Sequence, residues 1–423
     1  MNQAKKISLY NPLIAPKKQA ASIGLFWYGF LIFTVANVFL LIGNEYINGA
    51  VSQVIQLVSL AMMIAGISGM MKWKFDDKYL ESIFAVFIVY QLTVVARGIK
   101  FEYNYLKNLL LDAGYGILPY LVPLLILLPR NIGTYKKAFT ILAIFGVLFL
   151  AFASAYSDIL FNPDWLNQDA LLFVEVFVGT LAIPVAYLLM TFVYQKKAIN
   201  IFAFAVELTA IYFLLYRARR GSLSIILMML VAAGLVYLLY TKRTALVIFI
   251  GSVAALVGSV MVSGIKLPGI LTFIMARKDE DTRTGVEQWM YASMNTKFWL
   301  IGKGLDGTYY CPTVINLADN TYNRPVIETG YLQIILKGGI ISLVLMLLIL
   351  LPAVYKGFAK SNNVLSKGSA MFILIWIVSL YPTVGTGFGM TYILVWICAG
   401  ICYSKQIREL PDMAIKAHFK RLK

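Results

Sequence analysis

The sequence has few of the residues that enzymes commonly use for metal binding and proton transfer. Among 423 residues there is one histidine, His418, and there are three cysteines, Cys311, Cys398 and Cys402. A histidine metal site is therefore excluded, and cysteines placed in this way do not predict a disulfide framework. No Walker loop and no Asn-x-Ser/Thr sequon is present. We accordingly expect neither a bound metal nor an organic cofactor.

Charged residues are also scarce. They make up 13% of the chain, whereas hydrophobic residues make up 60%, and a soluble domain is usually nearer a quarter charged. Apolar runs of about 20 residues recur, which is the length that crosses a membrane as a helix. Alternating strands typical of a membrane β-barrel are absent from the pattern. The sequence thus predicts an all-α, polytopic integral membrane protein.

Apolar runs and charge together predict twelve spans with both termini in the cytoplasm. Lys and Arg concentrate on the segments that this topology places inside, as the positive-inside rule requires. The net charge of +17 therefore reports orientation, and we expect no nucleic-acid partner. The first run is too long for a cleaved signal peptide. The expected spans are 22–43, 50–71, 80–96, 109–128, 138–157, 169–194, 198–216, 222–240, 244–265, 338–355, 368–382 and 387–403.

This topology divides the chain into five parts. They are a cytoplasmic segment (1–21), a nine-span scaffold (22–265), an outer loop that carries the site (266–337), the last three spans (338–403) and a basic tail (404–423). The tail is expected to be solvated or to contact lipid headgroups. In the loop, Thr284-Gly-Val-Glu287 fits a capping box. The stripe of Val286, Trp289, Met290 and Met294 that follows predicts a short amphipathic helix that could lie on the membrane interface.

Arginines at the outer end of the seventh span form the first candidate site. Arg217, Arg219 and Arg220 lie within four residues, on the side where the charge rule disfavours them. On a continuous helix Arg217 and Arg220 would share a face. Guanidinium groups bind phosphate oxygens in a bidentate way, so the cluster predicts a pyrophosphate-bearing ligand. Headgroup contact is the alternative.

The polar stretch after the ninth span supplies further candidates. Glu328 could act as a general base if partial burial raised its pKa, and otherwise would cap a helix or pair with Arg324. Arg283 and the turn containing Gly302 and Gly304 could bind an anion through side chain and backbone, although a simple tight turn explains the glycines equally well.

Glu175 and Glu207 are acidic residues within expected spans. Such residues are costly in a membrane and are usually paired or functional. A polar partner for Glu207 is one interpretation. The other is a transporter that uses both acids.

Three segments together resemble the bacterial O-antigen polymerase and O-antigen ligase superfamily. Arg219-Arg-Gly-Ser222 is similar to its Ser-Arg-Gly-Ala motif, and the segment 298–305 is similar to its glycine turn. Glu328 to Gly339 resembles the family's entry into the next span. The resemblance covers residues 217–351 and agrees with the expected topology.

The resemblance implies a metal-independent glycosyltransferase of the bacterial inner membrane. Its donor would be an undecaprenyl-pyrophosphate-linked oligosaccharide, with membrane lipids and a chain-length regulator as further partners. Arg220 matches the motif arginine and Arg283 the loop arginine, which with Glu328 form the expected catalytic set. Arg217, Arg219, Arg324, Tyr331, Gly302 and Gly304 are the expected substrate-binding residues.

The residue at position 328 separates the two members of the superfamily. Ligases carry histidine where this chain has Glu328, so the resemblance favours a polymerase that joins lipid-linked repeat units. A ligase that transfers a finished glycan to another acceptor, with Glu328 in place of histidine, is the alternative.

Overall fold

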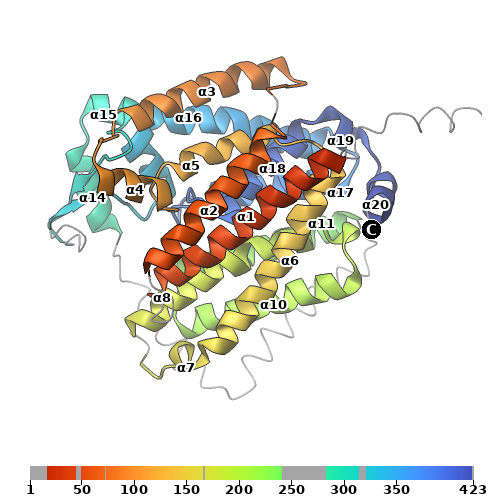
Figure 1. The fold of residues 1–423 in the computed structure, drawn as a ribbon, viewed down its shortest axis with the longest axis horizontal. Helices are drawn as coiled ribbons and strands as arrows, with labels where there is room; N and C mark the ends of the chain where they lie inside the picture. Colours follow the sequence, from red (N-terminus) through yellow and green to blue (C-terminus); the bar gives the residue numbers. More distant parts are fainter. Residues whose placement is uncertain are drawn as a thin grey trace, which may run out of the picture.

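The computed structural model describes residues 17–43, 49–71, 73–164, 167–240, 283–313 and 321–421. The expected ninth span, 244–265, lies outside these ranges. The described chain is predominantly helical (Figure 1). Its α-helices are α1 (Lys17–Leu41), α2 (Gly49–Ser68), α3 (Lys78–Ala96), α4 (Tyr103–Leu111), α5 (Leu118–Leu121), α6 (Ile132–Ala155), α7 (Ser157–Leu160), α8 (Gln168–Phe177), α9 (Ala186–Met190), α10 (Lys197–Tyr216), α11 (Arg220–Tyr240), α14 (Thr284–Ser293), α15 (Thr296–Ile301), α16 (Gly330–Ala359), α17 (Val364–Ser379), α18 (Met390–Tyr403), α19 (Lys405–Glu409) and α20 (Asp412–Arg421).

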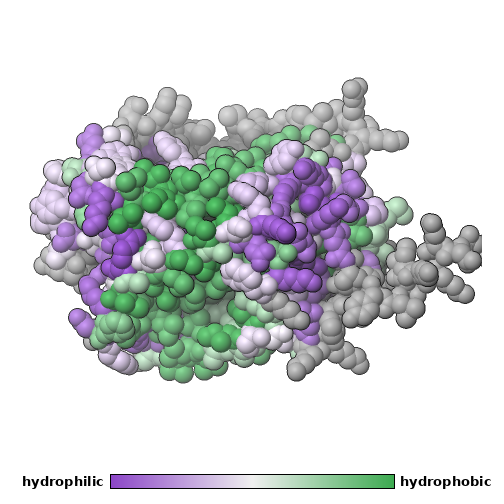
Figure 2. Space-filling view, turned by 90° about the horizontal axis from the view of Figure 1, so that it is seen from above, coloured by the Kyte–Doolittle hydropathy of each residue, from purple (hydrophilic) through white to green (hydrophobic). Residues whose placement is uncertain are grey.

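Within the described ranges, eight helical segments are long and apolar enough to cross a membrane, which confirms an all-α polytopic membrane protein. Figure 2 shows the corresponding apolar band between two hydrophilic ends. Three shorter apolar segments, Leu118–Leu127, Val364–Ser379 and Met390–Tyr403, coincide with the expected fourth, eleventh and twelfth spans. The count of twelve stays a prediction.

Two expected spans are interrupted, and proline lies within or beside each interruption. In the fourth, α4 ends at Leu111 and helical structure resumes only at Leu118, passing into the 3₁₀ segment Val122–Leu127, which contains Pro123. In the sixth, α8 continues as a π-helical segment, Val178–Ala182, and a 3₁₀ turn, Ile183–Val185, around Pro184. Proline lacks an N–H group, so a regular hydrogen-bond ladder cannot continue through it.

The expected tenth span also differs, because its helix begins at Gly330 and not at 338. It changes direction at Gly339, whose φ of +70° favours glycine. A Cβ at this position would lie 2.0 Å from the Leu300 carbonyl oxygen. The carbonyls freed by the kink are satisfied by the neighbouring turn: Lys303 N–H donates to Leu336 (2.8 Å) and Gly304 N–H to Lys337 (2.9 Å).

One end of the molecule carries α14 and α15 beside α4, and we call it the loop end (Figure 1). A two-stranded antiparallel hairpin, β1 (Tyr309–Tyr310) and β2 (Asn323–Arg324), packs next to α14. The predicted amphipathic helix is present as α14. However, its apolar face is directed at the protein, because Met290 and Met294 are buried in a cluster with Ile327 and Leu336 from the start of α16.

One further prediction about local structure is wrong, and the structure adds a contact to a second. The N-cap of α14 is Arg283, with no side-chain cap, so the capping box does not form; Glu287 instead accepts a hydrogen bond from the Thr329 hydroxyl. The C-terminal tail is not simply solvated, since α20 packs against the bundle. Phe419 stacks at 5.5 Å on both Phe139 and Tyr194.

Candidate functional site

The helix is interrupted within the arginine cluster, between the end of α10 and the start of α11. Ala218 has a φ of +51°, a conformation that side-chain-bearing residues rarely adopt. The predicted common helical face of Arg217 and Arg220 therefore does not exist. Arg217 ends α10 and turns inward, whereas Arg219 and Arg220 lie at the start of α11.

Arg217 has a structural environment in place of the predicted ligand-binding one. Its side chain is 1% exposed. Nη1 donates to the Asp164 carbonyl at 2.7 Å, and Nη2 donates to the carbonyls of Ile159, Leu160 and Asn162 at 3.2, 2.8 and 2.9 Å. Burial lowers the pKa of Arg217 from its ordinary value. Both terminal nitrogens of the guanidinium are thus engaged by carbonyls of α7 and of the segment that follows it.

Replacement of Arg217 by leucine should destabilise the protein without a specific effect on catalysis. Four carbonyls would lose their charged donor, and a buried polar group left without a partner costs about 1–3 kcal/mol. We expect a lower thermal midpoint in detergent and less protein in membranes. Arg217→Lys should recover only part of the stability, because one ammonium cannot reach four carbonyls. Normal stability of Arg217→Leu would contradict the structural role.

Two other predicted residues, Arg283 and Glu328, are brought together at the loop end, next to the start of α11. The Arg283 guanidinium donates to the Pro382 carbonyl at 2.9 Å, and its Nε lies 3.7 Å from the Glu328 carboxylate. A Cβ on Gly221, next to Arg220, would lie 3.3 Å from the same Pro382 oxygen and 3.8 Å from Arg283 Nη2. The loop after α17 thus contacts Arg283 through the Pro382 carbonyl and lies next to the start of α11.

Arg219 and Arg220 differ in what they contact. Arg219 forms an ion pair with Glu175 at 3.2 Å, so Glu175 belongs to this cluster and is not an isolated acid. Arg220 is exposed and has no ion-pair partner among the residues that the structure describes. Its position at the first residue of α11 adds the unsatisfied N–H groups of a helix start. Such a start attracts anions.

Glu328 lacks the burial on which its predicted basicity depended. Its side chain is 60% exposed, and its partner is Arg283 rather than Arg324. It sits directly before Thr329 and Gly330, whose N–H donates to the Leu380 carbonyl at 2.7 Å. This contact attaches the start of α16 to the same loop that holds Arg283.

The cluster borders a cavity of about 800 Å³. Glu175, Ser222 and Thr383 line it on the cluster side, and Asp112 and Tyr115 line it from the interruption between α4 and α5. Arg324, on β2, lies at the same end as the other predicted residues, because β2 pairs with β1 and β1 packs next to α14.

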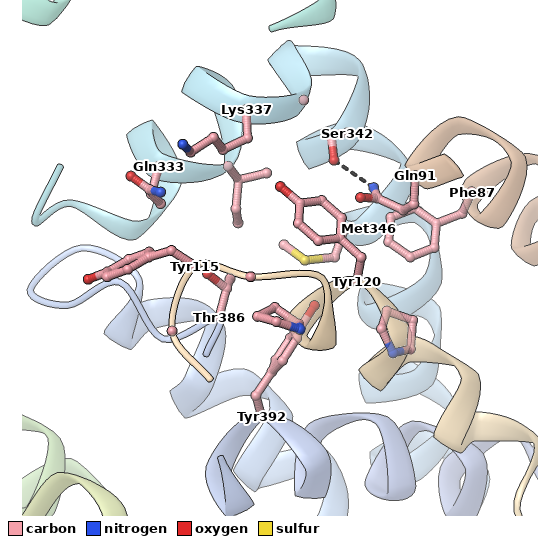
Figure 3. A pocket seen from close by; sticks show the side chains of 16 residues that line it. Phe87, Gln91, Tyr115, Tyr120, Gln333, Lys337, Ser342, Met346, Thr386 and Tyr392 are labelled. Atoms are coloured by element: carbon pink, nitrogen blue, oxygen red, sulfur yellow. Dashed lines mark hydrogen bonds between the residues drawn. The ribbon is translucent and has the colours of Figure 1, made fainter. Parts of the chain in front are cut away.

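A smaller cavity of about 70 Å³ adjoins the first, and Gly114, Tyr115 and Tyr392 line both. Figure 3 shows it between the loop at Tyr115 and the helix that carries Lys337, with Gln91 donating to Ser342 at 2.7 Å. Lys337 is buried and donates to the Gly307 carbonyl at 2.8 Å.

The predicted anion-binding turn is occupied by contacts within the protein. The N–H groups of Lys303 and Gly304 donate hydrogen bonds to backbone carbonyls of α16. A Cβ on Gly302 would lie 2.3 Å from the Lys337 carbonyl oxygen. Arg97 holds the turn from α3, donating to the carbonyls of Gly302 (3.1 Å) and Ile301 (2.6 Å). Gly302 and Gly304 are therefore structural, which corrects their predicted role as ligands.

Tyr331 is also structural, because its hydroxyl donates to the Ile377 carbonyl in α17. Among residues that we did not predict, Lys337 carried a usable signal: a lysine within an otherwise apolar run. Asp112 and Arg97 gave no such signal, because they lie near the ends of spans, where charged residues are common.

Glu207, the other acid within a span, is fully buried in α10. Among the residues that the structure describes, neither of its carboxyl oxygens has a hydrogen-bond partner. The polar partner expected from the sequence is thus not found within the described ranges. α10 packs against the interrupted part of the sixth span, between α8 and α9.

These features define the class of protein: a multi-pass helical membrane protein with a cavity of about 800 Å³ beside the arginine cluster at its loop end. A comparison with protein-family models, curated proteins and solved structures finds no match to the chain.

Proposed function

We propose that the protein is a metal-independent glycosyltransferase that polymerises surface-polysaccharide repeat units. The donor would be an undecaprenyl-pyrophosphate-linked glycan, and the acceptor a sugar hydroxyl of another lipid-linked repeat. One observation supports this above all: Arg283 and Glu328 pair beside the start of α11, which carries Arg220, at a loop whose Thr383 lines a cavity of about 800 Å³. The motif resemblance in this part of the chain agrees with it.

The chemistry would be a direct displacement at the anomeric carbon. The attacking hydroxyl oxygen forms the new glycosidic bond as the bond from the anomeric carbon to the pyrophosphate oxygen breaks, with inversion. The electron pair leaves with the pyrophosphate, where Arg220, Arg283 and the start of α11 would stabilise the developing charge. The hydroxyl proton would pass to Glu328.

In this proposal the loop end faces the outside of the bacterial inner membrane and both termini lie in the cytoplasm. The concentration of Lys and Arg at the opposite face of the predicted topology supports this orientation.

Reconstitution tests the proposal directly. Purified protein in nanodiscs is given undecaprenyl-pyrophosphate-linked repeat units, with no nucleotide and no ion gradient. We expect lipid-linked products longer than one repeat and release of undecaprenyl pyrophosphate. Transfer only to a different, added acceptor would identify a ligase instead. Absence of any transfer, with folded protein and verified substrate, would contradict a glycosyltransferase.

A Glu328→Gln substitution should lower the elongation rate about 10²-fold, the smaller end of what a general base contributes. Glutamine keeps the shape and loses the proton acceptor. Arg283 remains held by the Pro382 carbonyl, so donor binding should change little, and kcat should fall more than KM rises. A decrease of less than about threefold would restrict Glu328 to positioning Arg283.

A transporter is the second candidate, and one observation favours it. The sixth span is interrupted at 178–185, opposite α10, which carries the unpartnered Glu207. Interrupted helices near the membrane centre are common in transporters. Elongation without a gradient in the reconstituted system would remove this candidate, whereas gradient-dependent movement of glycan without elongation would support it.

A further inference from the structure

We propose that Trp289, Tyr310 and Tyr322 form an aromatic platform that binds the sugar chain of the lipid-linked substrate. The inference rests on the proposed function and adds a place for the glycan beside the pyrophosphate site. We use the term platform for these three side chains only.

The three rings form a continuous exposed row. The centroids of Trp289 and Tyr310 are 6.4 Å apart, and those of Tyr310 and Tyr322 are 6.1 Å apart. Both contacts are edge-to-face. The side chains are 39%, 52% and 43% exposed. Large aromatic residues in contact with one another normally bury their faces, so three such residues left open suggest a binding surface.

Local structure explains why these residues face outward. On α14, Met290 is buried against α16, which leaves the adjacent Trp289 on the open side. In the hairpin, Tyr309 pairs with Arg324 and is buried, so the next residue, Tyr310, points to the opposite face. The Tyr309 hydroxyl donates to the Val326 carbonyl at 3.1 Å and anchors the hairpin.

The platform lies close to the candidate site. Trp289 follows Arg283 by six residues along α14, a displacement of about 9 Å at the rise of an α-helix. Arg324 is two residues after Tyr322 on β2, and β2 pairs with β1, which packs against α14. A glycan whose pyrophosphate is held by Arg283 could therefore extend along α14 onto the rings.

Sugar chemistry suits such a surface. One face of a pyranose ring presents C–H groups, which are attracted to the negative face of an aromatic ring. Asn323, beside Tyr322 and also exposed, can hydrogen-bond sugar hydroxyls. Trp and Tyr also occur at membrane interfaces. Here, however, the apolar face of α14 is buried within the protein, and the platform belongs to the hydrophilic loop end (Figure 2).

A binding measurement tests the platform separately from catalysis. The probe is a soluble oligosaccharide released by mild acid from the surface polysaccharide of the expressing strain, so that it carries no pyrophosphate. We compare the full-length protein in nanodiscs with the Trp289→Ala/Tyr310→Ala double variant. The double variant should bind at least roughly tenfold more weakly, given typical aromatic contributions. It should also make shorter chains.

Two matched variants separate the outcomes. Tyr103→Ala removes an isolated aromatic residue that is 80% exposed and also lies at the loop end, and it should bind like the wild type. Arg220→Ala should retain oligosaccharide binding while losing elongation. Wild-type binding without elongation would refute the polymerase and keep the platform. Equal binding by the wild type and the double variant would refute the platform and leave the polymerase untouched.

Lipid contact is the remaining outcome. Brominated phospholipids in the nanodisc quench tryptophans that touch the bilayer. We expect the fluorescence attributable to Trp289, taken as the difference between the wild type and Trp289→Phe, to be insensitive to them and sensitive to aqueous iodide. Quenching by brominated lipid would make the aromatic row a membrane anchor and overturn the proposal.

Discussion

Replacement of Arg220 by alanine is expected to reduce glycan elongation about 10²–10³-fold while leaving protein abundance normal. Removal of one preorganised group that stabilises transition-state charge typically costs this much. Arg220 is exposed and forms no ion pair with any other described residue, so its loss should not destabilise the fold. The measurements are the length distribution of surface glycan in cells and the elongation rate in nanodiscs.

The conservative variant and a matched control sharpen this test. Arg220→Lys keeps the charge but loses bidentate contact with phosphate, so it should retain intermediate activity. Lys297→Ala removes an exposed cation on α15, also at the loop end, and should behave as the wild type. Long glycan chains in cells that contain normal amounts of Arg220→Ala would show that the pyrophosphate is bound elsewhere.

A Gly339→Ala substitution is expected to destabilise the protein by about 3 kcal/mol or more, combining a glycine-only backbone conformation with overpacking. The new Cβ would lie 2.0 Å from the Leu300 carbonyl oxygen and 2.5 Å from the Ile301 nitrogen. These are backbone atoms, so no side-chain rotation relieves the clash. We expect little folded protein, measured by fluorescence-detected size exclusion after heating.

Gly285→Ala is the matched control for this substitution. A Cβ at Gly285, within α14, meets nothing within 4 Å, and alanine favours a helix by about 0.5–1 kcal/mol over glycine. Its thermal midpoint should be unchanged or slightly higher. A Gly339→Ala protein as stable as the wild type would mean that the kink in α16 does not form as described.

The kink at Gly339 in α16 has two consequences for the candidate site. It allows the first part of α16, which follows Glu328, to run beside α15 and to meet the loop after α17. The same kink creates the free carbonyls that the turn at Gly302 and Gly304 satisfies. A motif that resembles an anion-binding turn in sequence therefore supports a helix break, and the proposed anion site lies elsewhere, at the start of α11.

The predicted helical spans were the easiest feature to derive, because the cost of exposing a backbone to lipid forces long apolar helices. Their interruptions were harder to foresee. Pro119, Pro123 and Pro184 marked two of them, but proline also occurs within helices, as at Pro352 in α16. Whether proline breaks a span depends on the groups that neighbouring segments offer to its freed carbonyls.

The candidate site was predicted in outline and revised in detail. Of the three residues expected together, Arg283 and Glu328 form an ion pair, and the start of α11, which carries Arg220, lies at the same loop. Arg217 was predicted to bind the ligand because a continuous helix would place it on the same face as Arg220. The positive φ of Ala218 shows that the helix is not continuous there. Neither the Pro382 carbonyl nor Asp112 could be foreseen, since backbone contacts and loop positions leave no pattern in residue types.

The amino-acid sequence alone determined that this protein is a helical, multi-pass membrane protein, because hydrophobicity and helical length respond to the lipid solvent residue by residue. Only the tertiary structure decided which guanidinium groups donate hydrogen bonds to carbonyls within the protein and which can still contact a ligand. The reason is physical: hydrogen bonds and ion pairs act over a few ångströms, so the fate of each polar side chain depends on neighbours that the fold brings from distant parts of the chain.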